Sequence, residues 1–546
     1  MSALRAVVAV PARDEEELIG RCIGALRDQE GVAPGSFEVV LVLDGCTDAT
    51  GARARAAAGD LVLHIDDRPA AGVGAARRAA MDLACARLEA AGIANGLVVT
   101  TDADSEPEPG WLAALLAAAD SGAHAIGGEI VVDGLGAAAA ARRAARLARR
   151  LEALPGAAHP HFSGASIALT VDTYRRVGGL EPRAALEDEA LARALARAEV
   201  PIARVAGARV RTSARPVGRA FRGLARDLAL DAWLERNSVW GPALSPAELA
   251  ARRTASASVV LPAREVADTI GPIVAALVPY RDAGAIDELV VVDAASGDST
   301  AGAAARAGAD VVQEDELMPG FGPCRGKGDA MWRALSATAG EIVVYLDADT
   351  RDFHPRLLTG LLAPLFARPE LTLVKGAFAR PFARGGELTA GEGGRVTELT
   401  ARPLLNLHRP ELAGFAQPLA GELAGRRTLF EQLAFPVGYG VEIAMLIDAL
   451  EHAGIDALAE ADLGTRQNRH QSLHELSRMS YAVLVAASRR LLGADAVDAL
   501  APGPYVQPGA GPHEMGVRDV GVEERPALAS LRASAAGSAH ACDRAG

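Results

Sequence analysis

A short apolar run that ends in Asp-Ala-Asp occurs twice in this chain. The first copy, residues 97–104, reads LVVTTDAD, and the second, residues 341–349, reads EIVVYLDAD. Both runs have the length and composition of a strand buried on both faces of a parallel sheet. Similar spacing joins VVAVPAR (7–13) to VVLPAR (259–264), and VLVLD (40–44) to LVVVD (289–293). The chain is therefore predicted to contain two similar α/β domains in tandem, because a solenoid would repeat at a far shorter period.

The paired aspartates stand where open α/β sheets bind their ligands, at the carboxyl end of a strand. They are Asp102 and Asp104 in the first copy, and Asp347 and Asp349 in the second. A carboxylate that leaves water needs a compensating charge, which a divalent ion shared with phosphate oxygens can supply. A single Asp-x-Asp pair could equally be a capped strand end whose second aspartate starts a helix. Its occurrence in both copies favours the metal and phosphate interpretation.

Composition excludes some classes of protein. The formal net charge of −13 argues against nucleic acid as a partner. The five cysteines show no metal-binding spacing, and we expect no signal peptide, so the thiols are predicted to be free in a reducing cytoplasm. No apolar run reaches the length of about 18 residues that a transmembrane segment needs.

The alternation of strand-like and helix-like segments predicts mostly parallel sheets that helices cover on both faces. We expect one domain over residues 1–233 and a second over 257–492. Between them, residues 234–256 are punctuated by proline and glycine and are predicted to be a linker. Residues 493–546 are rich in Pro, Gly and Ala and are predicted to form a largely disordered tail.

Two basic segments could bind anions. Residues 319–329, PGFGPCRGKGD, combine glycines with Arg325 and Lys327, which suits a diphosphate, although a mobile turn is the simpler alternative. Residues 137–151, AAAAARRAARLARRL, predict a basic helix. That helix could touch anionic lipid or an acidic acceptor, or could present an ordinary solvated face.

The first half resembles family 2 glycosyltransferases, which have the GT-A fold. The resemblance rests on VPARDEEE (10–17), LVLDGCTDAT (41–50), AGVGAAR (71–77) and TTDADSEPEPGW (100–111). It implies that the nucleotide sugar is bound by Pro11, Ala12, Asp14, Asp44 and Asp102. It also implies Asp104 as a metal ligand and Asp188 as the general base of an inverting transfer. The alternative for Asp188 is an acid at the start of a helix.

The second half, about residues 258–492, resembles the glucosyl-3-phosphoglycerate synthases, the retaining GT-A enzymes of glycosyltransferase family 81. The resemblance rests on LVKGAFAR (373–380), GGRVTEL (393–399), GYGVEI (438–443) and DLGTR (462–466). It implies transfer of glucose, usually from UDP-glucose, to the 2-hydroxyl of 3-phosphoglycerate, with Mg²⁺ or Mn²⁺ as cofactor.

The same resemblance assigns roles to residues of the second half. The nucleotide sugar would be bound by Pro262, Ala263, Glu265, Asp293, Lys327, Asp347, Tyr439 and Arg466. The acceptor would be bound by Gly394, Arg395 and Thr397, while Asp349 would hold the metal and act in catalysis together with Glu442. A guanidinium group such as that of Arg395 suits phosphate and carboxylate alike.

Two departures from the family pattern concern nucleotide and metal binding. The opening motif continues as Arg264-Glu265-Val266-Ala267 and so lacks its last two acids. The family's metal-binding histidine aligns with Asn468, and His470 follows two residues later. Asn468 could ligate through its carbonyl oxygen, His470 could reach the metal after a small loop shift, or metal affinity could be reduced.

The sequence therefore predicts a bifunctional glycosyltransferase. The alternative from another class is that one domain is inactive and serves as a nucleotide-sugar-binding or scaffold module. A nucleotidyltransferase would need a GxGxR-like loop after Val10 or Leu261, which the sequence lacks. The acceptor of the first domain and the oligomeric state stay open, a homodimer being one alternative.

Overall fold

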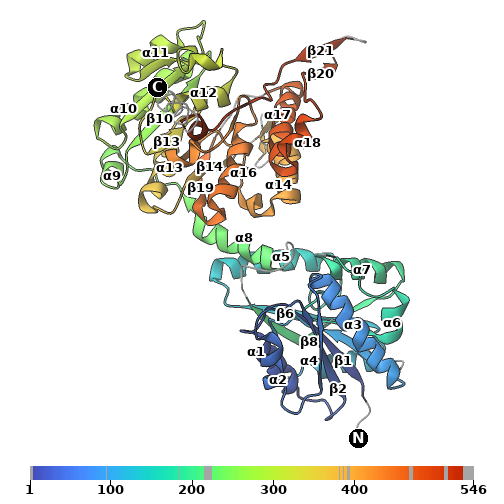
Figure 1. The fold of residues 1–546 in the computed structure, drawn as a ribbon. Helices are drawn as coiled ribbons and strands as arrows, with labels where there is room; N and C mark the ends of the chain where they lie inside the picture. Colours follow the sequence, from blue (N-terminus) through green and yellow to red (C-terminus); the bar gives the residue numbers. More distant parts are fainter. Residues whose placement is uncertain are drawn as a thin grey trace, which may run out of the picture. The chain divides into compact units, whose positions relative to one another are not determined.

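The computed structural model describes residues 4–93, 95–183, 185–213, 224–379, 382–384, 387–389, 394–466, 471–508 and 514–532. The chain divides into two compact units, Met1–Ala232 and Trp233–Gly546. Each unit is built on an eight-stranded sheet with helices packed against it (Figure 1). Asn468 and His470 lie outside the described residues.

The sheet of the first unit has the strand order β3-β2-β1-β4-β7-β6-β8-β5. The strands are β1 (Ala6–Ala12), β2 (Phe37–Asp44), β3 (Leu63–Arg68), β4 (Leu97–Thr100), β5 (Ser105–Pro107), β6 (Ala125–Asp133), β7 (Ile167–Thr170) and β8 (Ile202–Ser213). β1 pairs in parallel with β2 and β4, whereas β7 is antiparallel to both β4 and β6. The helices are α1 (Ile19–Arg27), α2 (Thr50–Ala58), α3 (Val73–Ala90), α4 (Trp111–Asp120), α5 (Ala137–Glu152), α6 (Val171–Arg176) and α7 (Glu187–Arg197), and α8 (Leu224–Asn237) contains the boundary between the two units.

Strand β1 shows why this sequence forms a sheet that is buried on both faces. Successive side chains of a strand point to opposite faces. Val8 and Val10 pack into one core with α1 and α4, while Val7 and Ala9 pack into another with α3 and α6. All of these side chains are fully buried. The predicted α/β architecture with mostly parallel sheets is confirmed.

The sheet of the second unit has the strand order β12-β11-β10-β13-β17-β14-β19-β9. Its strands are β9 (Ser238–Trp240), β10 (Ala257–Ala263), β11 (Glu288–Asp293), β12 (Asp310–Gln313), β13 (Ile342–Tyr345), β14 (Leu373–Ala379), β17 (Leu423–Arg426) and β19 (Leu458–Thr465). Smaller sheets pair β15 (Phe382–Arg384) with β16 (Glu387–Thr389), β18 (Phe435–Pro436) with β22 (Glu524–Arg525), and β20 (Tyr505–Pro508) with β21 (Met515–Arg518). The helices are α9 (Pro246–Ala250), α10 (Ala267–Asp282), α11 (Thr300–Ala307), α12 (Lys327–Ala334), α13 (Arg356–Ala367), α14 (Arg402–His408), α15 (Arg427–Phe430), α16 (Val441–Ala453), α17 (Leu473–Leu492) and α18 (Ala494–Asp498).

The stretch predicted as a linker, residues 234–256, instead contains packed elements. β9 pairs in parallel with β19. A Ser245–Glu248 capping box starts α9, whose Leu249 is fully buried. A three-residue strand and a five-residue helix are too short to show a periodic pattern, so proline and glycine dominate the sequence signal there.

The predicted disorder of the tail, residues 493–546, is wrong for the part that the structure describes. The Arg525 guanidinium donates to the fully buried carboxylate of Asp329 at 2.5 Å. The indole of Trp332 donates to the carbonyl oxygen of Pro526 at 2.9 Å. Because these contacts are polar, they do not require apolar residues at regular spacing in the tail. The composition of the tail therefore suggests disorder.

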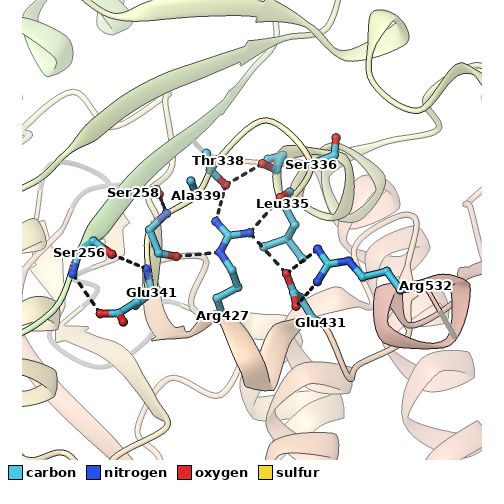
Figure 2. A network of polar contacts seen from close by, with 12 residues as sticks. Ser256, Ser258, Leu335, Ser336, Thr338, Ala339, Glu341, Arg427, Glu431 and Arg532 are labelled. Atoms are coloured by element: carbon cyan, nitrogen blue, oxygen red, sulfur yellow. Dashed lines mark hydrogen bonds and ion pairs between the residues drawn. The ribbon is translucent and has the colours of Figure 1, made fainter. Parts of the chain in front are cut away.

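A polar network around Arg427 ties a second point of this tail to the sheet (Figure 2). Arg427 donates to the carbonyl oxygens of Gly340 (2.7 Å) and Leu335 (2.9 Å), just before β13 begins. It also lies 3.7 Å from Glu431, which pairs with Arg532 at 2.9 Å. The last described helical turn of the chain is thereby fixed near the start of β13, the strand that Asp347 follows.

Among the described residues, no helix combines the length and the apolar character needed to cross a membrane.

Candidate active sites

A cavity of about 700 Å³ lies at the carboxyl ends of the central strands of the second unit. Pro262 and Ala263 reach it from the end of β10. Asp347 and Asp349 reach it from the residues that follow β13. The predicted residues Lys327, Tyr439 and Glu442 also line it. The topology therefore brings together predicted side chains that are far apart in the sequence.

Lys327 is the cation at the centre of this cavity. It is the first residue of α12 and follows Gly326, whose φ of 143° is open only to glycine in practice. Its Nζ donates to Asp347 Oδ1 at 2.6 Å and to Glu442 Oε1 at 2.9 Å. Burial alone would lower the pKa of Lys327, but these two carboxylates outweigh burial and raise that pKa above its ordinary value.

Arg466 provides a second cation for the same acids. It directly follows β19 and donates to Asp347 Oδ2 at 3.2 Å and to Asp349 Oδ1 at 3.4 Å. Its Nη1 also contacts the fully buried Glu422. Burial would raise the pKa of Asp347, but Lys327 and Arg466 hold that pKa well below its ordinary value. Asp347 is therefore ionised, and its carboxylate is paired with the side chains of Lys327 and Arg466.

Asp349 differs from Asp347 in its exposure. Its side chain keeps 64% of its accessible surface, against 21% for Asp347. Carboxylate oxygen is the ligand type that Mg²⁺ and Mn²⁺ prefer. The exposed carboxylate of Asp349, on the wall of the cavity, therefore fits a divalent ion better than the enclosed carboxylate of Asp347.

Other predicted residues lie beside the cavity but not in its lining. Asp293 accepts hydrogen bonds from Ser296, and Glu265 accepts one from the backbone of Gly297, so both acids stabilise the loop after β11. Arg395 donates to the carbonyl oxygen of Gln471, and Gln471 does line the cavity. Thr397 is buried in the short helical turn Thr397–Ala401.

The sequence interpretation missed two residues on which the cluster depends. Glu422 is the buried partner of Arg466. Gly421 is the second, since a Cβ there would lie 2.3 Å from Lys327 Nζ and 2.4 Å from Asp347 Oδ1. Neither has a signal in the sequence, because both follow an unremarkable turn and gain their role from tertiary contact.

The first unit has a cavity of about 710 Å³ at the matching strand ends. The predicted residues Pro11, Ala12, Asp44, Asp102, Asp104 and Asp188 all line it. Asp44 accepts from the backbone N–H groups of Ala71 (2.6 Å) and Gly72 (3.0 Å) and so holds the loop before α3. Asp14 is absent from the lining and accepts instead from the backbone of Thr47 at 2.6 Å.

Arg77 of α3 takes the place in this cavity that Lys327 takes in the other. It donates to Asp102 Oδ1 at 2.5 Å and to Glu187 Oε1 at 3.1 Å. Burial would lower the pKa of Arg77, but the two acids raise it. Glu187 was missed by the sequence interpretation, which selected its neighbour Asp188. The two acids occupy adjacent positions at the start of α7, and only the helix orientation decides which one is buried.

Asp188, next to Glu187 at the start of α7, is not paired with Arg77. Its Oδ1 accepts from the backbone of Glu189 at 2.8 Å. It is half-buried and lines the cavity, while Glu187 is buried against Arg77.

Comparison with known proteins connects both units to sugar transfer. The family described as "Glycosyl transferase family 2" matches residues 7–169 and 258–415. The glucosyl-3-phosphoglycerate synthase of Mycolicibacterium paratuberculosis is 43% identical over 264 residues, which are 48% of this chain and 80% of that protein. The enzyme of the same name from Mycolicibacterium smegmatis is 42% identical, over 47% of this chain and 85% of its own.

Solved structures are similar to about half of this chain. The mannosyl-3-phosphoglycerate synthase of Rubrobacter xylanophilus is 45% identical, with a TM-score of 0.50 over 55% of this chain and 99% of its own. A glucosyl-3-phosphoglycerate synthase of Mycobacterium tuberculosis, in complex with Mn²⁺, UDP-glucose and phosphoglyceric acid, is 37% identical, with a TM-score of 0.48 over 54% of this chain and 98% of its own.

Proposed function

We propose, from the premise that this chain belongs to glycosyl transferase family 2, that it carries two tandem GT-A domains with different reactions. The second unit transfers glucose from UDP-glucose to 3-phosphoglycerate with retention of configuration. The first unit is an inverting nucleotide-sugar transferase that acts on a separate acceptor.

The similarity to glucosyl-3-phosphoglycerate synthases supports a complete active site within one unit. The relative from Mycolicibacterium paratuberculosis is matched over 80% of its length, yet the match takes up 48% of this chain. The second unit holds the GGRVTEL, GYGVEI and DLGTR motifs. Its cavity also brings Lys327, Asp347 and Glu442 into one hydrogen-bonded group.

The cluster of the second unit suits a nucleoside-diphosphate sugar. Asp349 would hold Mg²⁺ or Mn²⁺, an ion that neutralises charge on the departing diphosphate when bound. Asn468 and His470 are further candidate ligands of this ion. Lys327 orients Asp347 and Glu442, and Arg466 adds positive charge beside the same acids.

Neither Glu442 nor Asp347 is placed to act as a covalent nucleophile. Glu442 is buried and paired with Lys327, and Asp347 is enclosed by two cations. We therefore infer attack of the acceptor hydroxyl on the same face from which the diphosphate departs, with a diphosphate oxygen taking the acceptor proton. Glu442 then positions the reactants through its fixed carboxylate.

In the first unit the division of labour between adjacent acids supports Asp188 as the general base. A base that takes a proton from an acceptor hydroxyl must not be tied to a permanent cation. Glu187 is paired with buried Arg77, whereas Asp188 accepts a backbone hydrogen bond at the edge of the cavity. Asp188→Asn should stop sugar transfer while donor affinity, measured by calorimetry, changes little. Loss of donor binding together with activity would contradict this role.

The experiment for the second unit supplies the full chain with 3-phosphoglycerate and Mn²⁺, and with UDP-glucose or GDP-mannose in parallel. The Rubrobacter relative motivates the mannose arm. Mass spectrometry should detect a hexosyl-3-phosphoglycerate with UDP-glucose, and the anomeric coupling in NMR should show retention. Activity should disappear when EDTA removes the metal and return with Mn²⁺. An inverted product, or none from either donor, would contradict the proposal.

A further inference from the structure

Three arginines and a histidine line the cavity of the first unit, and they come from three separate segments. Arg143 and Arg150 reach it from α5, Arg204 from β8, and His161 from the segment before β7. Within the part of the chain that the structure describes, Arg143, Arg150 and Arg204 form no ion pair. Asp227 also lines the cavity but forms no ion pair with these arginines within the described residues. Cations that share a cavity without an ion-paired acid indicate an anionic ligand.

Helix α5 divides its arginines between two tasks. Arg142 and Arg146 lie four residues apart and both pair with the buried carboxylate of Asp231, at 3.1 and 2.5 Å. Arg143 and Arg150 lie on the adjacent face together with Leu147, and these three line the cavity. The predicted basic helix is therefore neither a uniform solvated face nor wholly engaged in structural ion pairs.

The electrostatics of the pocket agree with arginines that have no ion-paired acid. Burial lowers the pKa of Arg143, and the like charges of Arg146 and Arg150 add to this effect, although Asp227 and Asp231 oppose it. Burial also lowers the pKa of Arg204, with no acid to offset it. A bound anion would remove both penalties.

His161 contributes a hydrogen-bond donor of known direction. Its Nδ1 accepts from the backbone N–H of Ile130 at 3.1 Å, so the neutral imidazole carries its proton on Nε2. Burial, with His159 and Arg143 nearby, lowers the pKa of His161 to about 4, which keeps the ring neutral at pH 7. In the described part of the chain, Nε2 of His161 and Nε of Arg204 are buried without a partner.

We propose that the acceptor of the first unit carries a phosphate or carboxylate group, which Arg143, Arg150 and Arg204 bind while His161 Nε2–H donates a hydrogen bond. This inference rests on the proposed transferase function of that unit. In the reaction the acceptor oxygen bonds to the anomeric carbon, Asp188 takes the hydroxyl proton, and the nucleoside diphosphate leaves. The anionic group of the acceptor only anchors it.

The two units differ at the strand position that Arg204 occupies in the first unit. Arg204 of β8 pairs with Gly127 of β6, whereas the corresponding pair in the second unit is Glu460 of β19 and Lys375 of β14. The first unit therefore has an arginine where the second has an acid. We infer that the two acceptors bind in different ways even though the strand order is shared.

The binding test uses two phosphorylated probes with the full chain, in the presence of UDP and Mn²⁺. One is glucosyl-3-phosphoglycerate, the product proposed for the second unit, and the other is a polyprenyl phosphate in detergent micelles. Calorimetry should show a site that Arg143→Ala/Arg150→Ala weakens at least about tenfold. Arg149→Ala, an exposed arginine of α5 outside the cavity, should leave that site intact. Neutral glucosylglycerol should not bind there.

The outcomes separate the source of the anion and the validity of the inference. Arginine-dependent binding of the first probe indicates a soluble acceptor, and of the second a lipid phosphate; each supports the proposal. Binding that ignores the arginines, or binding of neither probe, overturns it. The Asp349→Ala chain separates the two proposals. If this chain transfers sugar to neutral acceptors, and the arginine substitutions do not change its KM for them, the proposed anion site is wrong but the proposed transferase function of the first unit stands. If a probe binds through the arginines and the same chain consumes no nucleotide sugar, the transferase function is wrong instead.

Discussion

Each cavity contains an aspartate and a glutamate that pair with a cation, but the cation differs between the two units. In the first unit one buried guanidinium, Arg77, contacts Asp102 and Glu187, and it also donates to Thr100 and to the carbonyl oxygen of Gly164. In the second unit the ammonium of Lys327 bridges Asp347 and Glu442, and Arg466 provides a second cation.

This difference shows how strongly each pair of acids depends on a single cation. A planar guanidinium can satisfy several fixed acceptors at once, whereas an ammonium is a compact point charge. In the first unit, removal of the Arg77 side chain leaves both Asp102 and Glu187 without their cation partner. In the second unit, Asp347 keeps Arg466 when Lys327 is removed.

The largest expected effect is on stability. Arg77→Met should destabilise the first unit by about 3–5 kcal/mol, because the buried carboxylate of Glu187 and the half-buried carboxylate of Asp102 lose their counter-charge. Lys327→Met should cost the second unit less, since Arg466 remains beside Asp347. Hydrogen exchange read by mass spectrometry, with peptides from β4 and β13, reports on each unit separately. Equal losses, or a larger loss for Lys327→Met, would contradict the comparison.

Gly421→Ala tests the tight packing of the second cluster. The added Cβ would lie 2.3 Å from Lys327 Nζ, so the ammonium must move off Asp347. We expect kcat/KM for transfer to 3-phosphoglycerate to fall about a hundredfold, which corresponds to about 2.7 kcal/mol. Gly320→Ala is the control, because a Cβ there meets no atom within 4 Å. Similar rates for the two variants would show that Lys327 does not position the reactants.

The pair of residues at the shared register position predicts a pH effect in one unit only. Burial raises the pKa of Glu460 from 4.5 to about 6. The folded chain thus keeps this proton up to about pH 6, while the unfolded chain loses it near pH 4.5, so stability falls as pH rises through this window. Glu460→Gln should remove a change on the order of 2 kcal/mol in the free energy of unfolding.

Arg204→Gln, at the matching place in the first unit, is the control for that pH effect. A guanidinium stays charged throughout the range from pH 4.5 to 6. Denaturant unfolding of both variants across this range measures the difference from the unsubstituted chain. A flat difference for Glu460→Gln, or a pH-dependent difference for Arg204→Gln as large as that for Glu460→Gln, would contradict the assignment.

The smallest effect concerns the tail of the second unit. Arg532 is mostly exposed, so Arg532→Ala should cost less than about 1 kcal/mol. Arg427→Ala should cost more, because two backbone carbonyls and Thr338 lose a buried donor (Figure 2). Thermal unfolding compares the two. A larger loss for Arg532→Ala would mean that the tail carries more of the stability than its exposure suggests.

The sequence is sufficient to predict the central strands and the acids at their ends. Apolar β-branched runs such as 342–346 have one stable environment, a sheet buried on both faces. The sequence does not distinguish Glu187 from Asp188, because one residue of helix rotation decides which acid meets Arg77. It also does not reveal Gly421 or Glu422, whose roles exist only once distant segments have packed.

The elements at the edges were predicted least well, for a related reason. β9 and the anchor formed by Arg525 and Asp329 depend on backbone pairing and buried polar contacts. Such contacts produce no periodic apolar pattern. The sheet edge is also where the units differ, since β5 is antiparallel to β8 while β9 is parallel to β19.

The most direct test of the account asks which unit makes hexosyl-3-phosphoglycerate. Asp349→Ala and Asp104→Ala remove matching strand-end acids from the second and the first unit. Product formation from UDP-glucose and 3-phosphoglycerate by the full chain, measured by mass spectrometry, should fall at least about a hundredfold in Asp349→Ala. It should be unchanged in Asp104→Ala. An Asp349→Ala chain that retains more than about a tenth of the rate, or an Asp104→Ala chain that loses it, would contradict the assignment of this reaction to the second unit.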